Sequence, residues 1–307
     1  MFSVFGNKNR ASGQTGIYLS EEGVAAAHVV AATTHSRPRL AHCDYESGTD
    51  EGSLVSVVKR FSKRKSPTVS VLRPADYYLV LVEAPDVPEE ELRAAVRWRI
   101  KDLIDFHIDD AVIDVFQMPA QGRGVPNPMM YAIAAKAESV KQQVQVVESL
   151  GLKLEVIDIP ELCLRNVASM LEEDDKGVAL LHLDKGAGTL LLLRQGVMYL
   201  TRRIETGVEA LGMTAGLRSE LIAGLALEAR RSLDYFESHY EQTPIGVLYT
   251  SGLTPSDHDQ LTEDLGISVR NLSLDSFLEF DIDLSDEMQR LCLPAIGAAL
   301  RKESVTL

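Results

Sequence analysis

Short apolar runs in the first quarter of the chain alternate with polar turns in the manner of strands. Glu21-Glu22-Gly23 separates the first two runs, and Gly23 can supply the positive φ of a three-residue hairpin. A later segment spaces its apolar residues at helical intervals. We therefore predict strands at residues 15–20, 24–31, 39–45 and 68–72, and a helix at residues 52–63.

The last part of the chain repeats this order of elements. Three apolar runs separated by Gly-containing turns precede alternating helical and strand patterns. The expected strands are residues 178–183, 189–193, 197–204, 247–250 and 267–272, and the expected helices are residues 214–240, 257–265 and 286–300. Two such halves facing each other across a cleft describe the α/β actin-like ATPase fold, a duplicated ribonuclease H-like fold shared by actin, hexokinase and Hsp70. Element order alone also permits other mixed α/β folds.

An α+β pattern interrupts this repeat in the middle of the chain. Its first helix places Leu92, Val96, Ile100 and Leu103 on one face. Strands are predicted at residues 111–117 and 130–135, followed by a second helix that ends at Gly151 and a closing strand at 152–157. The expected division is a flexible tail at 1–14, a first half at 15–75 and 160–176, an inserted subdomain at 76–159, and a second half at 177–307.

The composition is that of an acidic folded protein. Its 307 residues are 45% hydrophobic, with a formal net charge of −14 and a pI of about 5.0. Such a surface repels phosphate backbones, so nucleic acid is not an expected partner. Three scattered cysteines without metal-ligand spacing are typical of reduced core thiols and indicate a cytoplasmic protein. The sequence shows no signal peptide and no apolar run of the ~20 residues that a membrane span needs.

The inserted segment carries the most specific sequence signal. It reads ELRAAVRW from Glu91, DLIDF from Asp102, then Asp109-Asp110 and Ile113-Asp114, and the chain closes with LPAIGAALR from Leu293. These stretches resemble the SHS2-type subdomain and the last helix of the PilM family of type IV pilus assembly proteins. The sequence at residues 99–102 and 106–110 is most similar to MshI, the family member that belongs to the mannose-sensitive haemagglutinin (MSHA) pilus.

The resemblance implies a scaffold on the cytoplasmic face of the bacterial inner membrane. Members bind the cytoplasmic N-terminal peptide of a PilN-like single-span membrane protein and connect it to the pilus assembly motor. Self-association is compatible with this role. The basic cluster at 59–65 suits a solvated helix end or a peripheral contact with lipid, and Trp98 suits either the core or a partner groove.

The resemblance also raises nucleotide binding, because actin-like ATPases hold ATP and Mg²⁺ at two hairpin turns. The turn of the second half, at residues 184–189, keeps the Asp-x-Gly motif of the family and the hydroxyl residue that follows it. The candidate nucleotide-binding residues are Asp184, Gly186, Gly188, Thr189, Gly207 and Gly252. Asp and Gly are also common in ordinary hairpin turns, so residues 184–189 could equally be a Gly-rich turn that binds no nucleotide. We predict no catalytic residue and no metal ligand.

The first-half turn departs from the family. Tyr18 stands in place of its Asp and Ser20 in place of its Gly, and Glu21 and Glu22 add two negative charges beside the expected phosphates. Weak or absent ATP binding and no ATP hydrolysis are therefore expected. A pilus scaffold is favoured over the alternatives, which are a nucleotide-dependent actin-like ATPase and a secretion-system assembly protein related to FtsA or to the cytoplasmic domain of the L protein.

Overall fold

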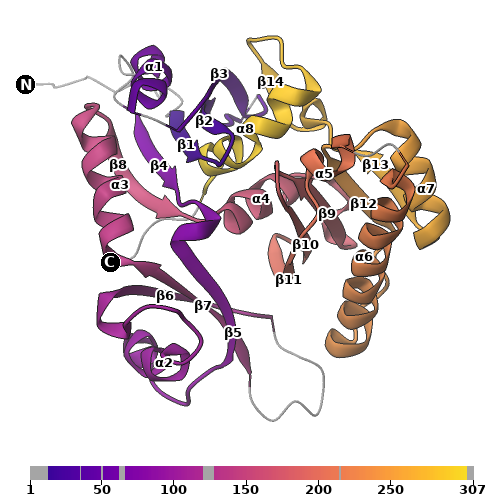
Figure 1. Ribbon diagram of the computed structural model, residues 1–307, viewed down its shortest axis with the longest axis horizontal. Coiled ribbons are helices and arrows are strands. Elements are labelled where there is room, and N and C mark those ends of the chain that lie inside the picture. The colour runs from indigo at the N-terminus through magenta and orange to yellow at the C-terminus, as the bar shows by residue number, and fades with distance from the viewer. Residues whose placement is uncertain are drawn as a thin grey trace, which may run out of the picture.

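The computed structural model describes residues 13–34, 36–49, 51–61, 66–119, 128–213 and 216–302. Two large sheets and one small sheet, with helices on their faces, make up this part of the chain (Figure 1). The 1–14 tail falls mostly outside the described residues, and Gly13 and Gln14 already belong to the first strand, where they pair with Val30 and Val29.

The first sheet has the strand order β14-β3-β2-β1-β4-β8. Its strands are β1 (Gly13–Leu19), β2 (Gly23–Val30), β3 (Arg39–Ser47), β4 (Pro67–Val71), β8 (Lys153–Asp158) and β14 (Glu279–Phe280). The second sheet has the order β11-β10-β9-β12-β13. Its strands are β9 (Val178–Leu183), β10 (Gly188–Arg194), β11 (Val197–Ile204), β12 (Val247–Ser251) and β13 (Ser268–Asn271). Leaving β14 aside, both sheets run third, second, first, fourth, fifth, so the predicted repeat is confirmed.

The helices form layers around these sheets. They are α1 (Glu51–Phe61), α2 (Leu92–Ile100), α3 (Ala137–Ser149), α4 (Pro160–Ala168), α5 (Val208–Met213), α6 (Arg218–Tyr240), α7 (Pro255–Leu265) and α8 (Asp286–Ala299). Helices α1 and α3 cover the outer face of the first sheet, and α6 and α7 cover the outer face of the second. Helices α4 and α8 lie between the two sheets in the largest apolar core.

Close packing of α4 against α8 depends on one glycine. A Cβ added at Gly297 would lie 2.1 Å from the carbonyl oxygen of Cys163, so a larger residue there would force the two helices apart. Although α8 follows the second half in sequence, it lies on the first sheet, and β14 joins that sheet by pairing with β3. The end of the chain therefore returns to the first half.

The small sheet is made of β5 (Tyr77–Glu83), β7 (Met129–Lys136) and β6 (Ala111–Gln117), in that order. Helix α2 covers one of its faces with Leu92, Val96 and Ile100, as predicted. Leu103 is 51% exposed, contrary to its predicted place on that face, because α2 ends at Ile100 and the helical spacing no longer applies.

Two pairings in this region differ from the prediction. The strand expected to close the inserted subdomain is β8, and it pairs in parallel with β4 of the first sheet instead. Strand β5, which was not predicted, takes its place in the small sheet and pairs with β7.

Candidate functional site

The second-half turn joins β9 to β10 and is held from two sides. Within the turn, the backbone N–H of Asp184 donates to the Ala187 carbonyl at 2.9 Å. From the start of α5, the Val208 N–H donates to the Asp184 carbonyl at 3.0 Å. Gly207 makes this approach possible, since a Cβ there would lie 2.2 Å from the Lys185 carbonyl oxygen. The turn and the start of α5 are therefore one packed unit.

The other predicted residues lie around the same turn. Gly188 begins β10, and Thr189 lines the cavity beside it. Gly186 faces the first half, where a Cβ added to it would lie 3.7 Å from Glu21 Oε2. Gly252 follows β12 with φ of +104°, and an added Cβ there would lie 3.1 Å from both Leu183 Cβ and Arg290 Cδ. The structure thus gathers all six candidate residues, but it fills the space beside Gly252 with side chains.

The first-half turn, between β1 and β2, uses its backbone donors internally. The N–H groups of Glu22 and Gly23 both donate to the hydroxyl oxygen of Ser20 at 3.1 Å. The Ser20 N–H donates to the Gly23 carbonyl at 2.8 Å. In a phosphate-binding turn such N–H groups point at the ligand. Here the side chain that replaces the family's glycine has taken two of them.

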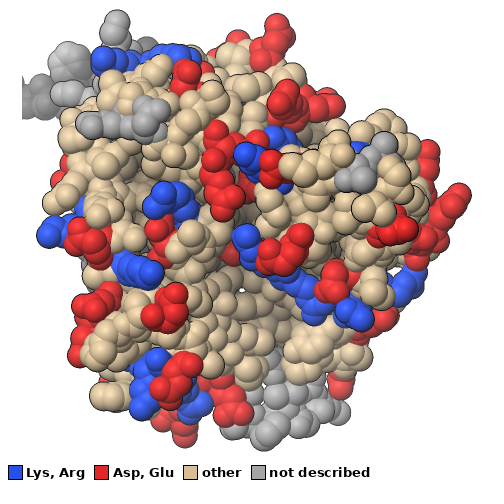
Figure 2. All heavy atoms as spheres, viewed as in Figure 1, with Lys and Arg blue, Asp and Glu red and all other residues tan. Residues whose placement is uncertain are grey.

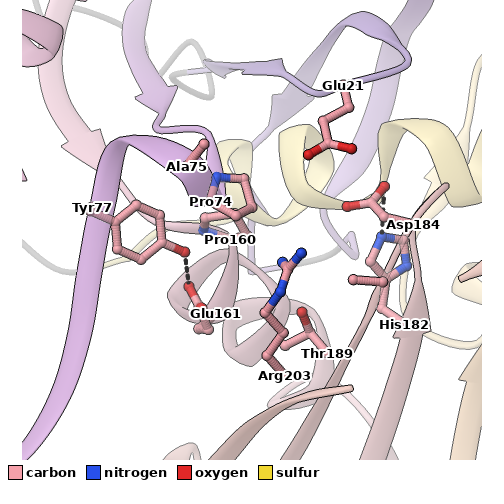
Figure 3. A pocket seen from close by; sticks show the side chains of 11 residues that line it. Glu21, Pro74, Ala75, Tyr77, Pro160, Glu161, His182, Asp184, Thr189 and Arg203 are labelled. Carbon is pink, nitrogen blue, oxygen red and sulfur yellow. Dashed lines mark hydrogen bonds and ion pairs between the residues drawn. The ribbon is translucent and has the colours of Figure 1, made fainter. Parts of the chain in front are cut away.

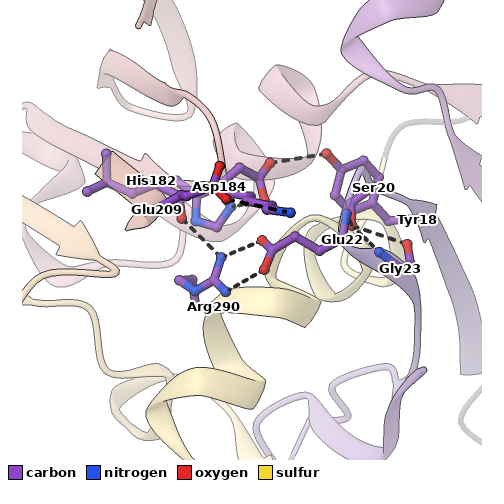
Figure 4. A network of polar contacts seen from close by, with 10 residues as sticks. Tyr18, Ser20, Glu22, Gly23, His182, Asp184, Glu209 and Arg290 are labelled. Atoms are coloured by element: carbon purple, nitrogen blue, oxygen red, sulfur yellow. Dashed lines mark hydrogen bonds and ion pairs between the residues drawn. The ribbon is translucent and has the colours of Figure 1, made fainter. Parts of the chain in front are cut away.

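Two contacts cross from the first turn to the second half (Figure 4). The Tyr18 hydroxyl donates to Asp184 Oδ2 at 3.2 Å. Arg290 of α8 holds Glu22 with two bonds of 2.8 and 3.0 Å, and its Nη1 also lies 3.4 Å from the Leu183 carbonyl oxygen. The Glu22 charge is therefore paired, contrary to the expectation that both glutamates would repel a phosphate as free charges.

These contacts change the acidity of the groups involved. Burial, followed by the charge of Asp184, raises the pKa of the Tyr18 hydroxyl well above its ordinary value, so Tyr18 stays a donor. Burial would raise the pKa of Asp184, but the nearby His182, with smaller effects from Tyr18 and Arg290, outweighs it and lowers that pKa. Asp184 is therefore an ionised acceptor held by its neighbours.

The space directly between the two turns is small, although Glu21, Asp184 and Thr189 also line the larger cavity beside it. The cavity lined by Tyr18, Glu21, Glu22, Asp184 and Gly186 measures about 30 Å³. The Asp184 carboxylate and the Glu22 carboxylate, which lie beside this space, already have protein partners.

A larger cavity of about 320 Å³ opens next to it, between the two halves (Figure 3). His182 lies at its wall, 2% exposed, with Nε2 3.8 Å from Asp184 Oδ1. On the opposite side the Tyr77 hydroxyl donates to Glu161 at 2.6 Å. Burial raises the pKa of Glu161. Among the described residues, no three His, Cys, Asp or Glu side chains lie close enough together to hold a metal ion.

A separate groove of about 450 Å³ lies between the first sheet and the small sheet. Strand β8 and α4 form one wall, and β6 and β7 form the other. Its apolar lining comes from Val112, Val115, Ile133, Val156, Ile159 and Leu162. Asp158 and Arg301 form an ion pair at its wall, and Arg93 pairs with Asp114 at 3.0 Å. Trp98 does not belong to this lining; it is 70% exposed on α2.

Sequence reasoning missed the part played by Arg290. The sequence offers one signal for this role: Arg290 lies in a predicted helix and is followed by three apolar residues, Leu291, Cys292 and Leu293. A charge at such a position needs a partner when it is buried. The partner itself could not be read from the sequence, because Glu22 lies 268 residues away.

No helix in the described part of the chain is long and apolar enough to cross a membrane. No curated protein matches the sequence. The fold is similar to a solved PilM–PilN type IV pilus biogenesis complex, with a TM-score of 0.69, 21% identity, and coverage of 94% of this chain and 97% of that one. It is also similar to the cytoplasmic domain of EpsL from the type II secretion system of Vibrio cholerae, with a TM-score of 0.54, 12% identity, and 95% and 97% coverage.

A protein of Bacteroides thetaiotaomicron described as having an actin-like ATPase fold matches with a TM-score of 0.50, 10% identity, and 92% and 96% coverage. These likenesses establish the actin-like fold. The family model for type IV pilus assembly protein PilM matches residues 51–213, which is more than half of the sequence. The chain therefore belongs to the PilM family of type IV pilus assembly proteins.

Proposed function

We propose that this protein is a scaffold of a type IV pilus assembly platform and binds the cytoplasmic N-terminal peptide of a PilN-like inner-membrane protein. The observation that carries this proposal is the 450 Å³ groove between β8 and β6. A solved relative in complex with PilN supports the class of partner.

The groove suits an extended chain. Strands β8 and β6 are edge strands of their sheets, so each has backbone groups facing away from its neighbour. An added strand gains affinity from main-chain hydrogen bonds and specificity from side-chain pockets. The apolar floor around Val156 and Leu162 offers such a pocket, and the charged pair of Arg93 and Asp114 lies at its rim.

The proposed arrangement places the protein on the cytoplasmic face of the bacterial inner membrane, held there by its partner. Residues 76–159 would then contain an SHS2-type subdomain that forms one wall of the groove. The MSHA pilus is the proposed system, on the strength of the sequence at 99–102 and 106–110. Contact with the assembly motor and self-association stay predictions.

The scaffold role does not require ATP. Ser20 occupies the backbone donors of the first turn, and Tyr18 and Arg290 bind the two carboxylates that a nucleotide would meet. We therefore propose that the protein neither hydrolyses ATP nor needs it to hold its two halves together.

The test is binding of a labelled peptide made of the first dozen or so residues of the PilN-like partner. The intact protein should bind it, and Val112→Glu should abolish binding, because Val112 lines the groove and a charge there opposes burial of an apolar side chain. Val197→Glu is the matched control, since Val112 and Val197 are 46% and 42% exposed and Val197 lies on β11, away from the groove. Unchanged binding by Val112→Glu would place the site elsewhere. An intact protein that fails to bind the peptide would remove the proposal.

A further inference from the structure

The small sheet borders a second groove, at its other edge. A cavity of about 350 Å³ lies between β5 and β7 on one side and β11 and α6 on the other. Leu79, Leu81 and Tyr131 line it from the small sheet. Their register, with Leu79 opposite Ile133 and Leu81 opposite Tyr131, places them on the same sheet face that lines the β8–β6 groove. The two grooves therefore adjoin opposite edges of one sheet face.

The backbone of β5 is available along this edge. At the end of the strand the Ala84 N–H donates to the Pro128 carbonyl at 2.7 Å, so residue 84 faces β7. Antiparallel pairs alternate in direction, so Val82 and Val80 also face β7, and the N–H and C=O groups of Leu81 and Leu79 point the other way. Within the described residues, these outward groups of Leu79 and Leu81 have no hydrogen-bond partner.

Strand β11, across the groove, differs in this respect. Its Thr201 N–H donates to the Tyr131 hydroxyl at 3.2 Å, and its Tyr199 carbonyl accepts from the Tyr240 hydroxyl at 2.9 Å. Tyrosine hydroxyls thus occupy outward groups of β11, while their rings contribute to the groove lining. An incoming strand would find open backbone at β5 and tyrosine rings opposite. Leu81, 39% exposed, lies beside that opening.

The rim of the groove carries two arginines and one carboxylate. Arg202 and Arg203 are adjacent on β11 and line the cavity together with Glu161, and Arg202 pairs with Glu228 at 2.8 Å. Arg203 pairs with Glu205, whose side chain is 82% exposed, so this pair is weak. The Arg203 charge also acts on Glu161, and an incoming carboxylate would compete with these two groups for the arginine. On the face shown in Figure 2, Lys and Arg side chains, interspersed with Asp and Glu, lie along the upper right margin of the central hollow.

We propose that β5 binds an extended segment of a partner protein as a fourth strand of the small sheet, and that this segment alternates acidic and apolar residues. Its backbone would pair with Leu79 and Leu81, and its apolar side chains would enter the tyrosine-lined groove. Its carboxylates would meet Arg203. This site is separate from the β8–β6 groove, and it does not depend on what that groove binds.

The test uses a fluorescent seven-residue peptide, equal in length to β5, that alternates glutamate and valine. Fluorescence anisotropy with the full chain should give saturable binding with a Kd below about 100 μM. A peptide alternating lysine and valine should bind at least about tenfold more weakly, because it presents the wrong charge to Arg203. An unlabelled PilN-like peptide should not compete for the site.

Two substitutions test the geometry. Leu81→Pro removes an N–H that β7 does not use, so it should weaken binding at least about tenfold while leaving the sheet paired. Leu81→Ala keeps that donor and should retain more of the affinity. Arg203→Glu should also abolish binding. Arg270→Glu, on the opposite edge strand β13, is its control, since Arg203 and Arg270 have 52% and 54% exposed side chains.

Circular dichroism checks that each variant is folded. If Leu81→Pro does not fold, the binding measured with Arg203→Glu tests the proposal. The proposal is overturned if the acidic peptide shows no saturable binding up to about 1 mM. It is also overturned if the lysine peptide binds equally well, or if folded Leu81→Pro and Arg203→Glu proteins bind as the unmodified chain does.

Discussion

Arg290 and Glu22 form a two-bond ion pair across 268 positions of sequence, with N–O distances of 2.8 and 3.0 Å. The pair joins helix α8 to the turn between β1 and β2. Both side chains are largely buried, with 9% of Arg290 and 17% of Glu22 exposed. The pair therefore holds the first turn in place.

Glu22→Gln should destabilise the protein by about 3 kcal/mol, because it leaves the buried Arg290 without its counter-charge. Urea unfolding measures this loss. Asp281→Asn is the control, since the Arg39–Asp281 pair is 41% exposed on both sides and should contribute less than about 1 kcal/mol. Similar losses in both variants would contradict the assignment of a structural role to Glu22.

Isothermal titration with Mg-ATP should show weak binding or none, because the cavity between the turns is about 30 Å³ and its flanking carboxylates are paired. If binding at millimolar concentration is detected, Asp184→Ala should weaken it more than Glu21→Ala. Removing Glu21 should strengthen it, since that carboxylate faces Gly186. A low-micromolar affinity of the unmodified protein would show that the turns do accept nucleotide.

Gly207→Ala should destabilise the second half by more than about 2 kcal/mol, since the new methyl group would meet the Lys185 carbonyl at 2.2 Å. Gly212→Ala is the control, within helix α5, which begins directly after Gly207; a Cβ added at Gly212 has nothing within 4 Å. It should be neutral or stabilising, because alanine is the better helix former. Thermal unfolding of both variants makes the comparison, and equal melting temperatures would be the contrary result.

Asp257 should give the protein an acid-sensitive stability. Burial would raise its pKa, but two bonds from Arg218 and further bonds from Thr254 outweigh it and lower the pKa to about 2. A lowered carboxyl pKa stabilises the folded state above the unfolded value of about 4, and this contribution is lost as the pH falls toward about 2. Asp257→Asn should flatten that part of the stability profile, and the exposed Asp259→Asn should not.

Trp98→Ala should change the free energy of unfolding by less than about 0.5 kcal/mol, because the side chain is 70% exposed. It should also leave the PilN-like peptide affinity unchanged, since Trp98 is outside the groove lining. As the chain contains a single tryptophan, its fluorescence reports this position alone. Emission typical of a water-exposed indole is expected, and a buried-type spectrum would contradict the placement.

The repeated element order could be predicted because strand and helix periods are local features of the sequence. Pairing is not local. The run at 152–157 has the pattern of a strand, yet its neighbour is β4, which lies more than 80 positions earlier. Strand β5 lies in another sheet, directly before the helical pattern of α2, and was not predicted. Leu103 continued a helical spacing beyond the residue at which the helix stops.

For the candidate site, too, the local features could be predicted from the sequence and the contacts between the two halves could not. The second-turn residues from Asp184 to Thr189 are contiguous, so their proximity was predictable. The loss of Asp and Gly in the first turn was also visible. That Ser20 would bond its own turn, that Tyr18 would donate to Asp184, and that Glu22 would meet Arg290 all depend on how the halves come together.

The position of α8 has a consequence for the order of events during synthesis. The inner face of the first sheet, including Leu40 and Val69, shares its core with Leu293 and Ile296 from the far end of the chain. The ribosome releases residues 40 and 69 more than 200 positions before residues 293 and 296. The first half therefore stays without its inner cover until α8 has emerged, and until then the apolar inner face of its sheet is exposed.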